Sequence, residues 1–208
     1  MIEVPNLETT HGYSKYKDYL SYKFGSVEAE FYLRDFNLLA ELQDLPEGSR
    51  VIDIGCGVDA RAVIQLQQQF PEYHFIGVNP TFEDEALQNS PISLLSITAE
   101  ELAETLPHGS TSLIMARNLF HHLSFFQHDS RYPVFKALPT KILQSVHHIL
   151  ETEGKFLVYD YAPGMPASYQ MTARAAQNAG FAVECGDSLY DISAPSERPM
   201  EYMRFMKK

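Results

Sequence analysis

The sequence predicts an α/β protein with a doubly wound, mostly parallel sheet. Short apolar segments alternate with segments of helical periodicity along most of the chain. The first apolar segment runs directly into two glycines one residue apart, Gly55 and Gly57. Strands that alternate with helices form parallel sheets covered by helices on both faces. With 208 residues, 45% of them hydrophobic, we expect one domain over residues 1–208, with helices in 1–48 and the sheet in 49–208.

The predicted strands are short, apolar and bounded by turn residues. They cover Arg50–Ile54, His74–Val78, Ile92–Leu95, Ser112–Ala116, Lys155–Tyr161, Gly180–Glu184 and Tyr202–Met206. The last two are joined by a loop that contains Pro and Ser rather than by a helix, so they must pair antiparallel.

Helical periodicity fills the segments between the strands. Two helices are expected within Tyr13–Leu42, with an interruption near Gly25. The later helices are expected over Ala60–Phe70, Glu83–Gln88, Ala99–Thr105, Pro139–Leu150 and Tyr169–Ala179.

Composition argues against several classes of function. The formal net charge of -11 would repel a phosphate backbone, so we expect no nucleic-acid partner. The N-terminus lacks a basic region followed by an apolar core, and no apolar stretch approaches the roughly 20 residues that span a bilayer. We therefore expect a cytoplasmic protein without a membrane partner. Cys56 and Cys185 have no metal-ligand or disulfide spacing, and we expect buried thiols and no metal. The oligomeric state stays open.

The stretch VIDIGCGVDAR indicates a ligand site. Glycines at 55 and 57 let the backbone turn sharply out of a buried strand, and the following helix presents free amides to an anionic group. A nicotinamide-dependent oxidoreductase is one alternative, because Gly55, Gly57 and Ala60 fit the dinucleotide fingerprint. That fingerprint normally opens its domain, whereas about fifty residues precede it here.

Four blocks in order resemble the class I S-adenosylmethionine-dependent methyltransferases. They are VIDIGCG, HFIGVNP, SLIMARNLFHHL and HHILETEGKFLVYDY. The resemblance extends from about Arg50 to the C-terminus. It implies a Rossmann-like sheet of seven strands with an antiparallel last strand, N-terminal helices that cap the site, and S-adenosylmethionine as cofactor.

The resemblance assigns cofactor roles to particular residues. It places the turn from Asp53 to Gly57 around the methionyl end, and the ribose, adenine and amino-group contacts further along the chain. The residues implied are Asp53, Gly55, Cys56 and Gly57 for the methionyl end, Asn79 for the ribose, Pro80, Thr98 and Ala99 for the adenine, and the backbone of Ala116 and Arg117 for the amino group.

Three positions depart from the family pattern. Asp59 replaces a third glycine, Asn79 replaces an acidic residue, and Thr98 replaces an aspartate. An amide at position 79 lacks the charge of a carboxylate, so we expect Asn79→Asp to tighten cofactor binding. A methyltransferase-like protein with weak or lost cofactor binding, which acts through partners, is therefore a second alternative.

Arg61 has two interpretations. The pattern around Asp59 resembles the G-x-G-x-D-x-R form of the leucine carboxyl methyltransferase branch, which implies that Arg61 helps to hold the cofactor carboxylate. Alternatively, Asp59 is the N-cap of the helix and Arg61 lies on a solvated face.

The acceptor side of the site is less determined. His121 and His122 follow the fourth predicted strand, at the edge where open α/β sheets bind ligands, and either could act as a general base. Alternatively, one ring packs and the other is solvated. We expect Tyr13, Tyr16, Asn118, Asp160 and Tyr161 to contact a small-molecule substrate. Alternatively, Tyr13 and Tyr16 pack the N-terminal helix onto the sheet, and Asp160 and Tyr161 only end a strand before a turn. The expected activity is methyl transfer to an oxygen, nitrogen or carbon of a small molecule.

Overall fold

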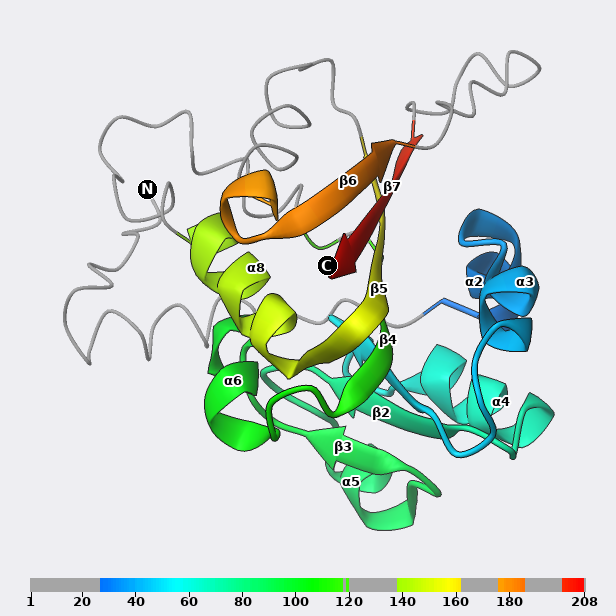
Figure 1. Cartoon of the computed structure of the whole chain (residues 1–208). Coiled ribbons are helices and arrows are strands. Elements are labelled where there is room, and N and C mark those ends of the chain that lie inside the picture. Colours follow the sequence, from blue (N-terminus) through cyan, green and yellow to red (C-terminus); the bar gives the residue numbers. More distant parts are fainter. Residues whose placement is uncertain (1–26, 118, 120–137, 162–175, 186–199, 208) are drawn as a thin grey trace, which may run out of the picture.

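The computed structural model describes residues 27–117, 119, 138–161, 176–185 and 200–207. Within them lies a sheet of seven strands in the order β3-β2-β1-β4-β5-β7-β6 (Figure 1). The neighbours from β3 to β5 pair in parallel, whereas β7 runs antiparallel to both β5 and β6. The strand order reverses at β1, so the predicted doubly wound sheet with an antiparallel last strand is confirmed.

The strands lie close to their predicted positions. Their bounds are β1 Arg50–Ile54, β2 His74–Val78, β3 Ser93–Leu95, β4 Thr111–Arg117, β5 Leu150–Tyr161, β6 Phe181–Cys185 and β7 Met200–Lys207. The boundaries of β1 and β2 agree with the prediction, because turn residues flank both strands closely in the sequence. The prediction was wrong for the start of β5, which begins at Leu150 rather than Lys155.

The described part of the predicted N-terminal helical segment forms two short helices, and α4 is one residue shorter than predicted at each end. They are α2 Ala29–Asp35, α3 Leu38–Gln43, α4 Arg61–Gln69, α5 Asp84–Asn89, the 3₁₀ turn η1 Ala99–Glu101, α6 Leu102–Thr105 and α8 Leu138–Ile149. The helical conformation is interrupted between α2 and α3 at Asn37, which adopts the left-handed conformation that Asn tolerates. The interruption expected near Gly25 lies outside the described residues. Of the helix expected over Tyr169–Ala179, only its last part is described, and residues 176–178 are helical.

The two faces of the sheet carry separate apolar layers. Figure 1 shows α6 and α8 on one face, and α2, α3 and α4 on the other. Because side chains alternate along a strand, Ile52 and Ile54 of β1 join the core on the α6 and α8 side. Val51 joins the core on the α2 to α4 side, and Asp53 points toward that same layer, where it meets Tyr32. The alternation therefore places one carboxylate beneath α2.

A tight bulge precedes the main part of β5. Leu150 pairs with Thr111, the register then shifts, and Lys155 pairs with Leu113. Within the bulge Glu153 has a φ of 66°, which is unfavourable for a residue with a side chain. A Cβ atom on Gly154 would lie 2.9 Å from the carbonyl oxygen of Glu151, so this close approach requires glycine. Pairing before and after the bulge explains why β5 starts earlier than the apolar run.

Ion pairs fasten α3 to the sheet. The Nζ atom of Lys155 lies 2.8 Å from the carboxylate of Glu41 and 3.1 Å from that of Asp44. Arg204 of β7 approaches the same Glu41 carboxylate at 3.5 Å. Because Glu41 is largely buried, these charges are screened less than ordinary surface pairs.

We expect Gly154→Ala to destabilise the fold by about 1–3 kcal/mol, because the new methyl group meets backbone atoms that cannot turn away. Chemical denaturation monitored by circular dichroism measures this change. The matched control is Glu153→Gly, which relieves a left-handed backbone and should cost nothing. Equal stability of Gly154→Ala and the parent chain would contradict the tight bulge.

Candidate cofactor site

The turn after β1 is built from left-handed backbone. Gly55 has a φ of 79° and Gly57 a φ of 83°, both values that favour glycine. The amides of Gly55 and Cys56 donate to the carbonyl oxygen of Val78 at 2.7 and 3.3 Å, which fixes the turn to the end of β2. A Cβ atom on Gly55 would lie 3.6 Å from Leu119, in the segment after β4. The turn therefore lies at the carboxyl edge of the sheet, at the point where the strand order reverses, which is where open α/β folds bind ligands.

The start of α4 differs from the expected cap. Ala60, with a φ of 48°, is the N-cap of α4, and no side chain caps this end. The interpretation of Asp59 as the N-cap is therefore wrong, because the backbone places the helix start one residue later. Asp59 instead forms an ion pair with Arg61 at 3.2 Å.

Arg61 links α4 to the segment before α2. Its guanidinium group lies 3.0 Å from the carboxylate of Glu28, and 54% of the side chain is exposed. Gln65 donates to the same carboxylate and accepts from the amide of Ala29 at 2.8 Å. Hydrogen bonds from Gln65 and then Arg61 lower the pKa of Glu28. Whether Arg61 also holds a cofactor carboxylate stays a prediction.

Asp53 is the central polar group of the site. Its carboxylate is fully buried, and one oxygen, Oδ2, accepts a hydrogen bond of 2.8 Å from the hydroxyl of Tyr32. The other oxygen, Oδ1, is buried and has no hydrogen-bond partner among the described residues. Burial raises the pKa of Asp53 to about 7, although the Tyr32 hydrogen bond and the charge of Arg117 both act to lower it. A buried oxygen without a donor is costly unless a ligand supplies one.

Arg117 is a cation whose charge acts on this carboxylate. It lies at the end of β4, only 11% of its side chain is exposed, and its guanidinium group binds Asp35 of α2 at 2.9 and 3.0 Å. The same group lies over the rings of Phe31 and Tyr159, at 5.5 and 5.6 Å from their centroids. The side chain of Arg117 thus holds α2, while the backbone of Ala116 and Arg117 remains the part predicted to face the cofactor.

Asn79 follows β2 and is held by two hydrogen bonds. Its backbone amide donates to the carbonyl oxygen of Leu95 at 3.2 Å, and its side-chain nitrogen donates to the carbonyl oxygen of Thr81. A carboxylate in this place would put two acceptors against each other. An aspartate at position 79 could not donate this hydrogen bond, and its loss opposes the gain expected for Asn79→Asp. The side-chain oxygen of Asn79 is then the group that can accept from a ribose hydroxyl.

Thr98 and Ala99 are buried at the start of η1. Thr98 donates from its backbone nitrogen and from its hydroxyl to the carboxylate of Glu101, at 2.7 and 3.1 Å. The Thr98 hydroxyl oxygen also accepts from the backbone amide of Glu101, and the two residues together form a capping box at a position where the family often has aspartate. Pro80 is partly buried beside Asn79.

The predicted acceptor side is only partly described. His121, His122, Tyr13, Tyr16 and Asn118 lie outside the described residues. Asp160 is buried near the end of β5, and Tyr161 is the last residue of that strand. The predicted roles of these residues stay predictions. The described residues contain no group of three His, Cys, Asp or Glu side chains able to hold a metal ion, and no helix among them could cross a membrane.

Sequence reasoning missed the contribution of α2 to this site. Tyr32 forms a hydrogen bond with Asp53, which lies 21 residues later in the sequence, and Asp35 binds Arg117, which lies 82 residues later. No spacing rule connects residues so far apart. The segment around Asp35 mixes apolar and charged residues, so its sequence carries no signal for these pairs, and the burial of Asp35 is seen only in the structure.

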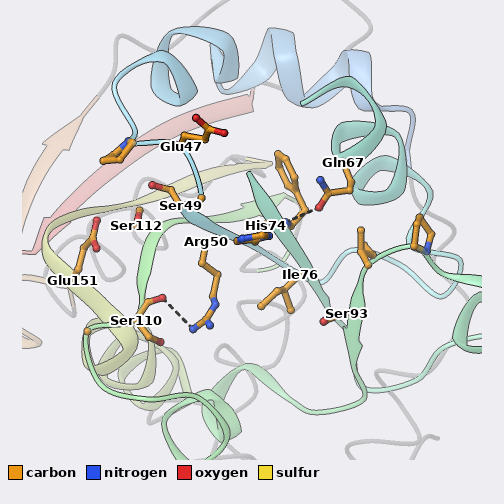
Figure 2. A pocket seen from close by; sticks show the side chains of 16 residues that line it. Glu47, Ser49, Arg50, Gln67, His74, Ile76, Ser93, Ser110, Ser112 and Glu151 are labelled. Carbon is orange, nitrogen blue, oxygen red and sulfur yellow. Dashed lines mark hydrogen bonds between the residues drawn. The ribbon is translucent and has the colours of Figure 1, made fainter. Parts of the chain in front are cut away.

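An open hollow of about 640 Å³ lies at the opposite edge of the sheet. It is formed around the first residues of β1, β2 and β4, and Figure 2 shows Arg50 reaching toward Ser110 within it. The guanidinium group of Arg50 donates to the carbonyl oxygen of Ser110 at 3.1 Å. Because the amino ends of the strands line this hollow, it is separate from the turn at Gly55 and Gly57.

Comparisons with known proteins agree with this architecture. A family model described as a methyltransferase domain matches residues 26–194. A TehB-like S-adenosylmethionine-dependent methyltransferase from Corynebacterium glutamicum superposes with a TM-score of 0.58 at 16% identity, over 98% of this chain and 100% of that one. A candidate O-methyltransferase from Nostoc punctiforme gives 0.56 at 17% identity, over 95% and 68% of the two chains.

A third neighbour is longer than this chain. Phosphoethanolamine N-methyltransferase 2 from Haemonchus contortus, in complex with S-adenosyl-L-methionine, gives a TM-score of 0.58 at 14% identity. The match covers 96% of this chain but 57% of that enzyme, so this chain spans little more than half of its length. At these identities the structures establish the fold alone. No curated protein sequence matches the chain.

The family assignment follows from the match over residues 26–194, which is most of the chain, together with the sheet order and the glycine turn. The prediction of S-adenosylmethionine as cofactor agrees with the family and with a neighbour that holds it. The chain belongs to the class I S-adenosylmethionine-dependent methyltransferases.

Proposed function

We propose that this protein binds S-adenosylmethionine above the turn at Gly55 and Gly57 and methylates a small-molecule acceptor. The observation that carries the proposal is the Oδ1 oxygen of Asp53, which is buried at the carboxyl end of β1 beside that turn and has no hydrogen-bond partner among the described residues. A cationic ammonium group is the donor that best satisfies a buried carboxylate oxygen. The methionyl end of the cofactor carries such a group.

The other residues fit the remaining parts of the cofactor. The turn formed by Gly55, Cys56 and Gly57 gives a close backbone approach, and the side-chain oxygen of Asn79 is oriented by its bond to Thr81. Pro80 and Ala99 supply apolar surface for an adenine ring. When bound, the cofactor supplies a sulfonium methyl group that an acceptor nucleophile can displace.

The acceptor is proposed to be a small molecule. The net charge of -11 disfavours a nucleic acid, which is a polyanion. Neighbours of this fold include an enzyme named for phosphoethanolamine and a candidate O-methyltransferase, so the fold is compatible with nitrogen and oxygen acceptors. We assign acceptor contacts to Tyr13, Tyr16, Asn118, Asp160 and Tyr161, and leave the methylated atom open.

Gly57→Val should abolish binding of S-adenosylhomocysteine, because a branched side chain would occupy the ligand's approach. Titration calorimetry measures the affinity, and thermal melting measures the fold. Gly48→Val is the matched control, since Gly48 has nearly the same φ of 82° but lies in the turn at the opposite edge, with nothing within 4 Å of its Cβ position. Both variants should lose similar stability, about 1–2 kcal/mol, while only Gly57→Val loses the ligand. Retained affinity in Gly57→Val would remove the turn from the site.

Asn79→Asp should weaken the same ligand by about fivefold or more, because the carboxylate loses the donor that Asn79 gives to the Thr81 carbonyl. Asn89→Asp is the control: it makes the same chemical change at an exposed position near the end of α5, where Asn89 also donates to a backbone carbonyl. It should leave the affinity unchanged. Tighter binding by Asn79→Asp would show that the ribose contact outweighs the local hydrogen bond.

If His121 or His122 acts as a general base, its replacement by Ala should lower the turnover rate by roughly a hundredfold and spare the cofactor affinity. The rate of the parent enzyme should also fall as the pH drops through the imidazole range near 6.5. The acceptor must first be found by screening metabolites for methyl incorporation. His74→Ala is the control, because His74 is exposed at the other edge of the sheet. Near-normal turnover in the double variant His121→Ala, His122→Ala would exclude the general-base role.

A further inference from the structure

Helix α2 is joined to the proposed cofactor site by side chains from successive turns. Glu28, immediately before the helix, binds Arg61 and Gln65 of α4. Tyr32 donates to Asp53 at the end of β1. Asp35, in the last turn, binds Arg117 at the end of β4. Three positions spaced three or four residues apart thus reach three different core elements.

The contact between Tyr32 and Asp53 gives one carboxylate oxygen a hydrogen-bond donor, and the other oxygen has none among the described residues. The Tyr32 hydroxyl lies 2.8 Å from Oδ2, and both side chains are almost completely buried. Burial and the nearby Asp53 raise the pKa of Tyr32 well above its ordinary value, so its hydroxyl remains a donor. Oδ2 therefore already has one donor, whereas Oδ1 has none among the described residues and is the oxygen that most needs one.

In the described part of the chain, Tyr32 is the one side chain that donates a hydrogen bond to Asp53. Arg117 acts on Asp53 through its charge but gives its hydrogen bonds to Asp35. Cys56, in the adjoining turn, is a buried thiol whose pKa is raised by burial and by Asp53, so it brings no charge.

We propose that Tyr32 is a positioning residue of the cofactor site: its hydroxyl holds Oδ2 of Asp53, favours the ionised carboxylate, and leaves Oδ1 to accept from the cofactor ammonium group. This role rests on the proposed function. It also gives α2 a part in cofactor binding, because the hydroxyl belongs to a helix outside the cofactor-binding motif.

The affinity for the cofactor should depend on pH through the ionisation of Asp53. A protonated Asp53 is a poor partner for an ammonium group, so binding favours the ionised form and releases a proton when the pH lies near the carboxyl pKa. Burial raises that pKa to about 7, and affinity should therefore fall as the pH drops below this value. Removal of the Tyr32 hydroxyl removes a contact that lowers the pKa, so the midpoint should move to higher pH.

The test measures the affinity for S-adenosylhomocysteine by calorimetry from pH 5.5 to 8.5 in the parent chain, Tyr32→Phe and Tyr73→Phe. In Tyr32→Phe we expect the midpoint to rise by about one pH unit, which weakens binding about fivefold at pH 7. Tyr73→Phe is the matched control, because Tyr73 is also buried and its hydroxyl donates to the carbonyl oxygen of Leu42 at 2.7 Å, away from Asp53. Its midpoint should equal that of the parent chain.

The results distinguish the role of Tyr32 from cofactor binding itself. If Tyr32→Phe binds more weakly but keeps the parent midpoint, as a merely structural loss would, the positioning role is overturned. If the parent chain binds no S-adenosylhomocysteine at any pH, the proposed function fails and this role fails with it. Asp53→Asn provides a second variant should Tyr32→Phe not fold: it should remove the pH step, and persistence of the step would assign the titration to another group.

Discussion

The buried carboxylate of Asp53 is the constraint on which the site depends. Its pKa is about 7 in the fold, against 3.8 for an ordinary aspartate, so the folded chain holds this proton more tightly than the unfolded chain does. The stability that this group contributes is therefore greatest below pH 4 and is lost as the pH rises toward 7. With a pKa of about 7, about half of the Asp53 carboxyl groups are ionised near neutral pH, in an apolar setting. Carboxyl groups with strongly shifted pKa values cluster at functional sites.

The surrounding structure reduces this cost in two ways. Tyr32 donates a hydrogen bond to the carboxylate. The positive charge of Arg117 also lowers the pKa of Asp53, although the hydrogen bonds of Arg117 go to Asp35. Asp35 binds Arg117 through Oδ2 and Arg34 through Oδ1, so one carboxylate of α2 is shared by two arginines. A second set of charges, Lys155 with Glu41 and Asp44, fastens α3 further along the same face. The two short helices are thus placed by charges as well as by apolar packing.

Local patterns were sufficient to predict the sheet but not the polar contacts beneath α2. The bounds of β1 and β2 agreed because each strand is a buried apolar run with a turn at both ends. The bulge before β5 was missed because pairing across a register shift leaves no periodic signal. Asp53 and the glycines were found from a motif, whereas Tyr32 and Asp35 act through distant partners. Asn79 and Thr98, which depart from the family pattern, make local contacts that the pattern does not predict: a hydrogen bond to Thr81 and a capping box with Glu101.

Cys56 packs against Gly77 of β2, and the reactivity of its thiol can report on the turn. A Cβ atom on Gly77 would lie 3.0 Å from the sulfur of Cys56, which is 1% exposed and free. A thiol reagent attacks the thiolate, and burial suppresses both access and ionisation at this position. The rate at which an alkylating agent modifies Cys56 therefore measures how often the turn separates from β2. Peptide mass mapping distinguishes this modification from that of Cys185, and a ligand bound over the turn would slow it without any change in the labelling chemistry.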